Sequence, residues 1–294
     1  MSYAIVSPVK DEASRLGATA ESIERQTLRP AQWVIVDDGS TDGTRELAQQ
    51  LAGAHDWITA IDSGADGERS RGGRVVRAFE GGRAALYGEH DFLVKLDGDI
   101  TLPPDYFERV ASTFDADPRA GIVGGRVLVH DGSGWVPERV GKHTVHGAIK
   151  AYRTACLEDI GGLHASMGWD GIDEYAAKAR DWKVIPLDGL LVHHHRQRGS
   201  KQRWWRARIE EGRGAHYMGY RPSFVIVRAG YRMLVEKPPV LGGAALFAGW
   251  LQAAASRAPI VDDPQAVAAL REEQRERLRG RRVRPHTISP PAAR

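Results

Sequence analysis

Two aspartates that flank one glycine are the clearest candidates for a metal site in this sequence. Asp97 and Asp99 end an apolar run at 92–96, which is too short for a helix and suits a strand buried on both faces of a parallel sheet. Ligands bind at the carboxyl ends of such strands, and Gly98 should let the chain turn so that both carboxylates reach one cation or its phosphates. An ordinary exposed Asp-Gly turn is the alternative.

Two earlier apolar runs also end in acidic residues. The run at 3–9 leads to Glu12, and the run at 33–36 leads to Asp37 and Asp38. Helix capping by residues 40–42 would explain a polar turn there, but not two aspartates directly after a buried strand. The carboxyl ends of parallel strands share one edge of a sheet, so these acids are expected to lie there close to Asp97 and Asp99. The repulsion among so many carboxylates would be tolerable if a cation and a hydrogen-bonding ligand bound between them.

Strands and helices alternate along the first half of the chain. After the first two strand–helix units, a weaker strand is expected at 58–61 and a helix at 74–86. This alternation predicts an α/β fold with an open, parallel, three-layer sheet. Arginines near the start of the third helix, including Arg71 and Arg74, oppose the helix dipole unless an anion compensates. One or two of them are therefore expected to face a phosphate.

Composition limits the compartment and the partners. The 294 residues, 42% of them hydrophobic, can form one large α/β domain with or without an appended module. The single cysteine, Cys156, excludes an internal disulfide and fits a reducing cytoplasm, and the first residues do not resemble a secretion signal. Net charge is only +3, but the segment 196–232 contains ten lysines and arginines and only two glutamates. The second half is therefore the basic half.

Three motifs, in this order, resemble those of family-2 inverting nucleotide-sugar glycosyltransferases with the GT-A fold. They lie at 7–12 (SPVKDE), 36–44 (VDDGSTDGT) and 95–99 (KLDGD), and the resemblance covers residues 3 to about 195. The first motif departs from the family, which more often has an Asn-Glu pair where this chain has Lys-Asp-Glu. The resemblance implies a Rossmann-like, mostly parallel sheet flanked by helices.

The resemblance also implies roles for individual residues. Asp97 is expected on the ribose or the metal, and Asp99 on the metal that bridges the donor diphosphate. The other expected nucleotide-binding residues are Pro8, Val9, Glu12, Asp37, Asp38 and Arg74.

The catalytic base is expected on a helix that opens at 168–175 (GWDGIDEY). The spacing from Asp170 to residues 182–184 (WKV) resembles that from the family's catalytic Glu-Asp to its following aromatic residue and strand. Trp169 replaces the usual glutamate, which leaves Asp170 and Asp173 as alternatives for the base. Asp170 could instead serve as a helix cap.

Three histidines at 193–195 end another apolar run. Related enzymes often place a metal-binding histidine here, and imidazole with carboxylates suits a Mn²⁺-like ion. His194 and His195 are both candidates, and a solvated run is the alternative. The expected cofactor is a divalent cation, Mn²⁺ or Mg²⁺.

Residues 1–197 are thus expected to form a GT-A catalytic domain, with a donor half at 1–100 and an acceptor half at 101–197. A basic helical extension should follow at 198–280 and a disordered tail at 281–294. The resemblance implies that a loop after residue 197 closes over donor and acceptor. The residues expected to contact donor or acceptor at this loop are Arg71, Trp169, Lys201, Arg203 and Trp204. The segment at 240–252 is too short to span a bilayer, which needs about 20 apolar residues. It could lie on a membrane surface or form a buried hairpin against the catalytic domain.

These features predict a metal-dependent inverting glycosyltransferase of the hexosyltransferase class. It would move a sugar from a UDP-, GDP- or dTDP-sugar to a saccharide acceptor, which a lipid could carry, in cell-envelope or exopolysaccharide assembly. The expected location is the cytoplasm, with peripheral attachment to the inner face of the plasma membrane. One alternative is a sugar nucleotidyltransferase on a related sheet, although its glycine-rich first turn is missing after Val6. Another is a non-enzymatic membrane or RNA adaptor, although no nucleic-acid motif is present.

Overall fold

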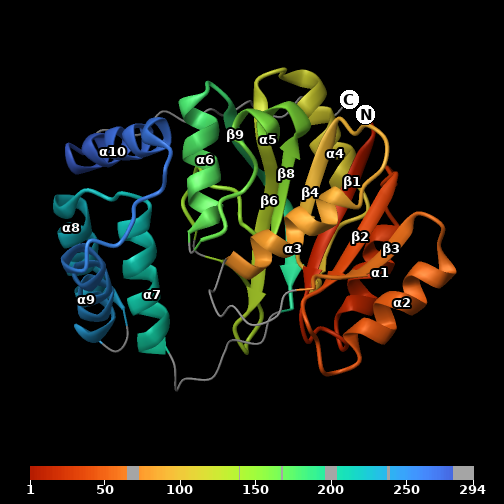
Figure 1. The fold of residues 1–294 in the computed structure, drawn as a ribbon, viewed down its shortest axis with the longest axis horizontal. Coiled ribbons are helices and arrows are strands. Elements are labelled where there is room, and N and C mark those ends of the chain that lie inside the picture. The colour runs from red at the N-terminus through yellow and green to blue at the C-terminus, as the bar shows by residue number, and fades with distance from the viewer. Residues whose placement is uncertain (65–72, 139, 167, 196–203, 237–238, 281–294) are drawn as a thin grey trace.

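A mixed sheet flanked by helices forms the larger part of the structure (Figure 1). The computed structural model describes residues 1–64, 73–138, 140–166, 168–195, 204–236 and 239–280. Within these residues, nine strands pair in one sheet with the order β3-β2-β1-β4-β8-β6-β9-β5, and β7 pairs with β6 outside this path.

The elements of the first half alternate as the sequence predicts. They are β1 (Tyr3–Val9), α1 (Leu16–Glu24), β2 (Gln32–Asp37), α2 (Thr44–Ala54), β3 (Ile58–Asp62), α3 (Gly73–Ala84) and β4 (Phe92–Leu96). The four strands among them pair in parallel.

The next elements complete the sheet. They are β5 (Ile100–Thr101), α4 (Tyr106–Ala116), β6 (Ala120–His130), β7 (Trp135–Pro137), β8 (Ile149–Arg153), α5 (Thr154–Asp159), α6 (Trp169–Ala179) and β9 (Lys183–His194). β8 runs antiparallel to both β4 and β6, whereas β9 runs parallel to β6. The sheet is therefore mostly parallel, as the sequence predicts, with β8 as an antiparallel strand between β4 and β6. The described part of the connection from β6 to β8 contains β7 but no helix, and a parallel return requires a longer crossover, usually helical.

This topology brings six carboxyl ends of strands to one edge of the sheet. They are the ends of β1, β2, β3, β4, β6 and β9, and the start of β8 lies beside them.

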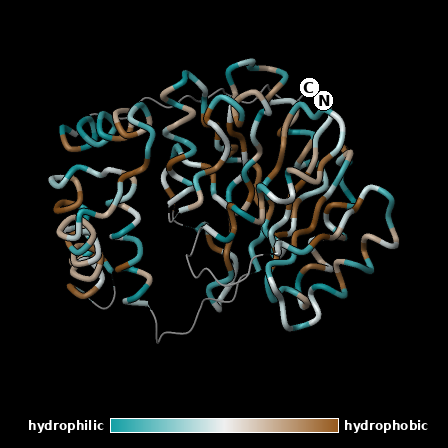
Figure 2. The backbone as a smooth tube through the Cα atoms, viewed as in Figure 1, coloured by the Kyte–Doolittle hydropathy of each residue, from teal (hydrophilic) through white to brown (hydrophobic). Residues whose placement is uncertain are grey.

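Strands β1, β2 and β4 of the donor half are buried on both faces, which explains their nearly continuous apolar sequence. In β1, Ile5 belongs to a core cluster with Phe92 and Phe107, whereas the adjacent Val6 belongs to the opposite cluster with Phe79. Figure 2 shows the strands as the most hydrophobic part of the sheet region. Helices on both faces therefore hold the strand ends in fixed positions.

Four further helices lie beyond α6, at the far end from β3 (Figure 1). They are α7 (Trp204–Tyr217), α8 (Pro222–Val235), α9 (Leu241–Ala255) and α10 (Pro264–Leu278). The chain approaches itself closely between α7 and α9, because a methyl group built on Gly212 would lie 2.0 Å from the Leu246 carbonyl oxygen. The segment 240–252 is thus a helix packed on α7 and α8, and not a hairpin against the catalytic domain. Among the described helices, none is long and apolar enough to cross a membrane.

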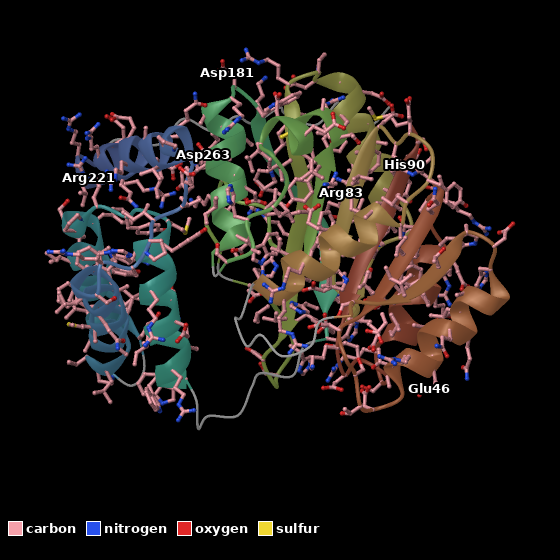
Figure 3. All side chains as sticks on the ribbon, in the orientation of Figure 1. Glu46, Arg83, His90, Asp181, Arg221 and Asp263 are labelled. Atoms are coloured by element: carbon pink, nitrogen blue, oxygen red, sulfur yellow. The ribbon has the colours of Figure 1, made fainter. Side chains whose placement is uncertain are left out.

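Helix α10 joins the helical unit to the sheet domain. The Tyr175 hydroxyl of α6 donates a hydrogen bond of 3.0 Å to Glu273 of α10. Arg180 forms an ion pair of 3.0 Å with Asp263, which Figure 3 labels where α10 approaches α6.

Candidate functional site

The loops after β1 and β2 are bound to each other at the sheet edge. The Glu12 main-chain N–H donates to the Thr44 hydroxyl at 2.7 Å, and the Thr41 N–H donates to the Asp11 carboxylate at 2.8 Å. Burial raises the pKa of Glu12; the charges of Asp99 and Asp97 raise it further, and Arg15 opposes both. Glu12 therefore lies within the electrostatic reach of the acids after β4, as the sequence predicts.

The two aspartates after β2 have different environments. Asp37 is 1% exposed and accepts hydrogen bonds from the Ser40 N–H and the Arg45 guanidinium at 3.2 and 3.1 Å. Asp38 forms a 2.8 Å ion pair with Arg74 and accepts from the Ser63 hydroxyl at 3.1 Å. Asp37 thus holds the turn, whereas Asp38 and Arg74 form a polar pair beside it.

The acids after β4 form a cluster with one histidine of β9. Ligand atoms of Asp97, Asp99 and His194 all lie within 4.8 Å of one another. Nε2 of His194 lies 3.2 Å from Oδ1 of Asp99, and the Asp97 carboxylate contacts the ammonium group of Lys95. Two carboxylates and an imidazole are ligands that suit Mn²⁺ and related cations.

Gly98 serves a different purpose from the expected one. Its φ angle is not positive, so the turn does not need glycine for its backbone conformation. Instead, a methyl group built on Gly98 would lie 2.6 Å from Cγ1 of Val9. Glycine therefore lets the strand ends of β1 and β4 approach each other at the cluster.

A second carboxylate lies behind the histidine of the cluster. Oε2 of Glu138 is 2.9 Å from Nε2 of His146 and 3.7 Å from Nδ1 of His194. His146 and His194 hold the pKa of Glu138 far below its usual range. Although burial opposes it, the carboxylates of Asp99 and Glu138 raise the pKa of His194 to about 9. Glu138 therefore faces the imidazole nitrogen that points away from Asp99, the usual position of a group that orients a metal-binding histidine.

His195 lies outside this cluster. Its Nε2 is 2.9 Å from the Thr101 hydroxyl, and its ring packs edge-on against Trp135. Of the two histidine candidates, the geometry thus brings His194 to the acids.

Helix α6 presents the candidate base at its first turn. Gly168 precedes the helix with φ 87°, and no side chain caps it. Asp170 is exposed, and its carboxylate lies beside the main chain before β8, because a methyl group built on Gly147 would lie 3.2 Å from Oδ2 of Asp170. Asp170 thus does not serve as the cap of this helix.

Asp173, the alternative base, is buried in an ion cluster. Both of its carboxylate oxygens accept from the Lys150 ammonium at 2.8 Å, and one accepts from the Tyr152 hydroxyl at 2.6 Å. Lys150 also lies 3.2 Å from Glu174 and donates to the main-chain carbonyl of Asp170. This cluster holds the first turn of α6 against β8.

The segment 147–148 lies between Asp170 and the cluster of Asp97, Asp99 and His194. The Asp97 N–H donates to the carbonyl of Ala148 at 2.9 Å, next to Gly147 and its contact with Asp170. The Lys95 and Lys150 ammonium groups lie 5.3 and 5.8 Å from the centre of the Trp169 ring. The expected cation site and the expected base therefore lie at one part of the sheet edge.

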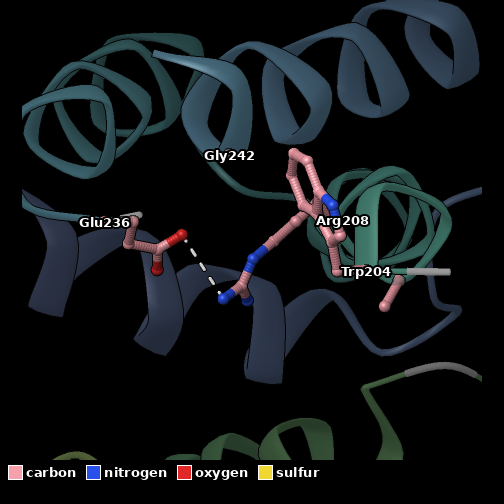
Figure 4. Close-up of a pocket in the computed structure, with 5 residues that line it drawn as sticks. Trp204, Arg208, Glu236 and Gly242 are labelled. Carbon is pink, nitrogen blue, oxygen red and sulfur yellow. Dashed lines mark ion pairs between the residues drawn. The ribbon is translucent and has the colours of Figure 1, made fainter. Parts of the chain in front are cut away.

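The remaining expected residues fall in three places. Pro8 and Val9 end β1, where Val9 packs on Gly98. Arg71, Lys201 and Arg203 lie outside the described residues. Trp204 begins α7 and lines a hollow of about 250 Å³ in the helical unit, together with Ala207, Arg208, Glu236 and Gly242 (Figure 4).

This hollow differs in character from the sheet edge. Arg208 and Glu236 form a 3.3 Å ion pair across it, and none of Asp97, Asp99 and His194 lines it.

Sequence reasoning missed Glu138, Lys95 and Lys150. A lysine inside an apolar strand, as at positions 95 and 150, indicates a buried anionic partner, because an unpaired buried charge is costly. No comparable signal marks Glu138, since its two histidine partners become neighbours only in the folded sheet.

A mostly parallel sheet with acidic strand ends and a neighbouring acid-bearing helix is the arrangement of the GT-A fold. The structure resembles that of the mannosyltransferase PcManGT from Pyrobaculum calidifontis in complex with GDP-Man and Mn²⁺. The TM-score is 0.55 at 19% identity, over 93% of this chain and 81% of that one. A model of glycosyl transferase family 2 matches residues 4–160, more than half of the sequence. The chain belongs to glycosyl transferase family 2.

Two curated relatives match parts of the chain. The succinoglycan biosynthesis protein ExoA of Rhizobium meliloti is 39% identical over 108 residues, which are 36% of this chain and 30% of ExoA. The glucosyl-dolichyl phosphate glucuronosyltransferase of Haloferax volcanii is 28% identical over 110 residues, 37% of this chain and 32% of that protein. The match thus spans about a third of the length of these relatives.

Proposed function

We propose that this chain transfers a sugar from a nucleotide-sugar donor to a hydroxyl of a saccharide acceptor, with inversion at the anomeric carbon. One observation carries the proposal: the cluster of Asp97, Asp99 and His194 lies at the same part of the sheet edge as the exposed carboxylate of Asp170. A cation site beside a free base is the arrangement that a displacement with an anionic leaving group needs.

The residues of the cluster fit a divalent cation. Asp97, Asp99 and His194 offer two carboxylates and an imidazole nitrogen within 4.8 Å, and Glu138 faces the second nitrogen of the imidazole. This donor set suits Mn²⁺, with Mg²⁺ as the alternative. When bound, such an ion would neutralise charge on the departing nucleoside diphosphate.

In the proposed transfer, Asp170 acts as the general base and other residues bind the donor. The Asp170 carboxylate takes the proton of the acceptor hydroxyl as the acceptor oxygen forms its bond to the anomeric carbon. The bond from that carbon to the donor phosphate breaks, and its electron pair leaves with the nucleoside diphosphate. A single in-line displacement inverts the anomeric centre. Glu12 and Asp38, which follow β1 and β2, would bind the nucleoside together with Arg74, the ion-pair partner of Asp38.

The relatives support a class of acceptor. ExoA is named for succinoglycan biosynthesis, and the Haloferax enzyme is named for a glucosyl-dolichyl phosphate. We therefore propose a saccharide acceptor carried by a lipid, in cell-envelope or exopolysaccharide assembly. The chain would act in the cytoplasm as a peripheral protein at the inner face of the plasma membrane.

A panel of UDP-, GDP- and dTDP-sugars tests the activity. One donor should raise the melting temperature in Mn²⁺ and release its nucleoside diphosphate, and NMR of the product should show the inverted anomer. The Asp99→Asn variant is the matched control and should lose the Mn²⁺-dependent shift. Release of pyrophosphate from a nucleoside triphosphate and a sugar phosphate, without sugar transfer, would instead identify a nucleotidyltransferase and contradict the proposal.

A further inference from the structure

Helix α8 turns its charged side chains inward. Its only charged residues are Arg228 and Arg232, and each places a guanidinium nitrogen 2.7 Å from a carboxylate oxygen of Glu211 on α7. Arg232 is only 17% exposed in its side chain. The inner side also buries Val225 and Ala229 against α9. A helix on the surface of a water-soluble domain normally has its charged residues on the outward side, where α8 has none.

The outward face of α8 is an apolar stripe, which we define as Ile226, Val227, Tyr231, Leu234 and Val235. Leu234 is 85% exposed and Tyr231 65%, and the other three are more than half exposed. Their spacing of four and eight residues places them on one side of the helix. Large apolar side chains gathered on one exposed face indicate a surface that is covered when the protein works.

The stripe continues beyond the end of α8. Val240 and Leu241, at the start of α9, are also more than half exposed, and α9 contains no charged residue. Figure 2 shows hydrophobic segments on both α8 and α9 at the edge of the molecule away from the sheet. The apolar surface therefore belongs to the helical unit and lies apart from the sheet edge that carries Asp99.

We propose that the apolar stripe of α8 inserts into the interfacial layer of a lipid bilayer with anionic headgroups. Between residues 198 and 257 the chain has eleven lysines and arginines against three glutamates, and anionic lipids attract such a segment. Arg228 pairs with Glu211, and Arg232 pairs with Glu211 and Glu236, on the inner side of the helix. The stripe itself carries no charge, so it can enter the interface without desolvating an ion.

The mode of binding follows from the length of the helices. Since no described helix can cross a membrane, α8 would lie in the plane of the interface. Tyr231, with an apolar ring and a polar hydroxyl, suits the boundary between headgroups and acyl chains.

Docking through α8 would also orient the catalytic domain. The N–H of Arg221, just before α8, donates to Gln274 of α10 at 2.9 Å, and α10 is bound to α6 through Glu273 and Tyr175. Helix α6 carries Asp170. This consequence rests on the proposed transfer to a lipid-linked acceptor, whereas binding to the bilayer can be measured without it.

The test uses the full chain and flotation with vesicles of phosphatidylcholine, with and without phosphatidylglycerol. The wild type should float with the anionic vesicles. The double variant Val227→Ser, Leu234→Ser should reduce the partition coefficient about tenfold or more, because it removes two inserted apolar side chains. Tyr87→Ser is the matched control, since Tyr87 is 65% exposed but lies on the sheet domain, and it should float like the wild type.

Two readouts keep the test decisive. Circular dichroism and melting temperature should match between the double variant and the wild type, and if they do not, the single variant Leu234→Ser takes its place. Equal flotation of wild type and variant would overturn the proposal. The proposal would also be overturned if the wild type did not float and instead formed a dimer, seen by analytical ultracentrifugation, and the double variant were a monomer. Vesicle binding in a protein that transfers no sugar would support the docking surface and refute the proposed function alone.

Discussion

Replacing Glu174 by glutamine should change how stability depends on pH. Glu174 is buried in the first half of α6, where Oε1 accepts from the Val145 N–H at 2.8 Å and lies 3.2 Å from the Lys150 ammonium. The carboxylate shares that lysine with Asp173. Glutamine keeps a carbonyl oxygen for Val145 but cannot ionise, so the variant isolates the effect of the buried charge.

The magnitude follows from the pKa. Burial, opposed by Lys150 and reinforced by Asp173, raises the pKa of Glu174 from 4.5 to about 7. A carboxyl group with a raised pKa contributes stability that is complete below the unfolded pKa and is lost as the pH rises through the folded pKa. At about 1.4 kcal/mol for each pH unit, the wild type loses up to ~3 kcal/mol between pH 4.5 and pH 8. The glutamine variant should not show this loss.

Urea unfolding at pH 5 and pH 8 measures the difference. The free energy of unfolding of Glu174→Gln should rise relative to the wild type as the pH increases, and the variant should be the more stable protein at pH 8. Glu89→Gln is the control, because Glu89 is exposed, and its difference from the wild type should stay small at both values. A difference for Glu174→Gln that does not change with pH would refute the reasoning.

Three further predictions concern the candidate site. Asp99→Asn should weaken nucleotide binding in Mn²⁺ but not in EDTA, as measured by calorimetry; equal weakening in both would exclude a role in metal binding. Glu138→Gln should lower Mn²⁺ affinity about 10- to 100-fold, because it removes the group that orients His194, and unchanged affinity by electron paramagnetic resonance would show that Glu138 has no such role. Gly147→Ala should slow transfer by about 10²-fold with nucleotide affinity retained, since its methyl group would lie 3.0 Å from Cβ of Asp170; wild-type turnover would mean that the contact does not position the base.

The donor half could be predicted because its signals are local. Each buried strand gives an apolar run, and the acids at its end are adjacent in sequence, so the position of Asp38, Asp97 and Asp99 follows from the parallel topology. His194 could not be placed beside these acids in the same way, because it comes from β9, which reaches this edge by pairing with β6.

Other features depend on pairings that the sequence does not show. β8 runs antiparallel to β4, which brings Gly147 and Ala148 to the site from a segment with no recognisable motif. The apolar residues of α8 predict a helix, but an amphipathic pattern does not say which face turns inward. The contacts of Glu211 with Arg228 and Arg232 show that both arginines lie on the inner side, together with Val225 and Ala229.

The two candidate bases show the same limit. Asp170 and Asp173 are one helical turn apart, and sequence spacing left both open. In the fold, Asp173 is occupied by Lys150 and Tyr152, whereas Asp170 is exposed beside Gly147. Burial and partners therefore support Asp170 as the base and a structural role for Asp173.

The rate of sugar transfer by Asp170→Asn tests the central claim most directly. Asparagine keeps the size of the side chain and the main-chain carbonyl that binds Lys150, but it removes the basicity that general-base catalysis needs. We expect a wild-type melting temperature and nucleotide affinity, with transfer reduced by about 10²-fold or more. Transfer at the wild-type rate by a correctly folded Asp170→Asn variant would contradict this claim.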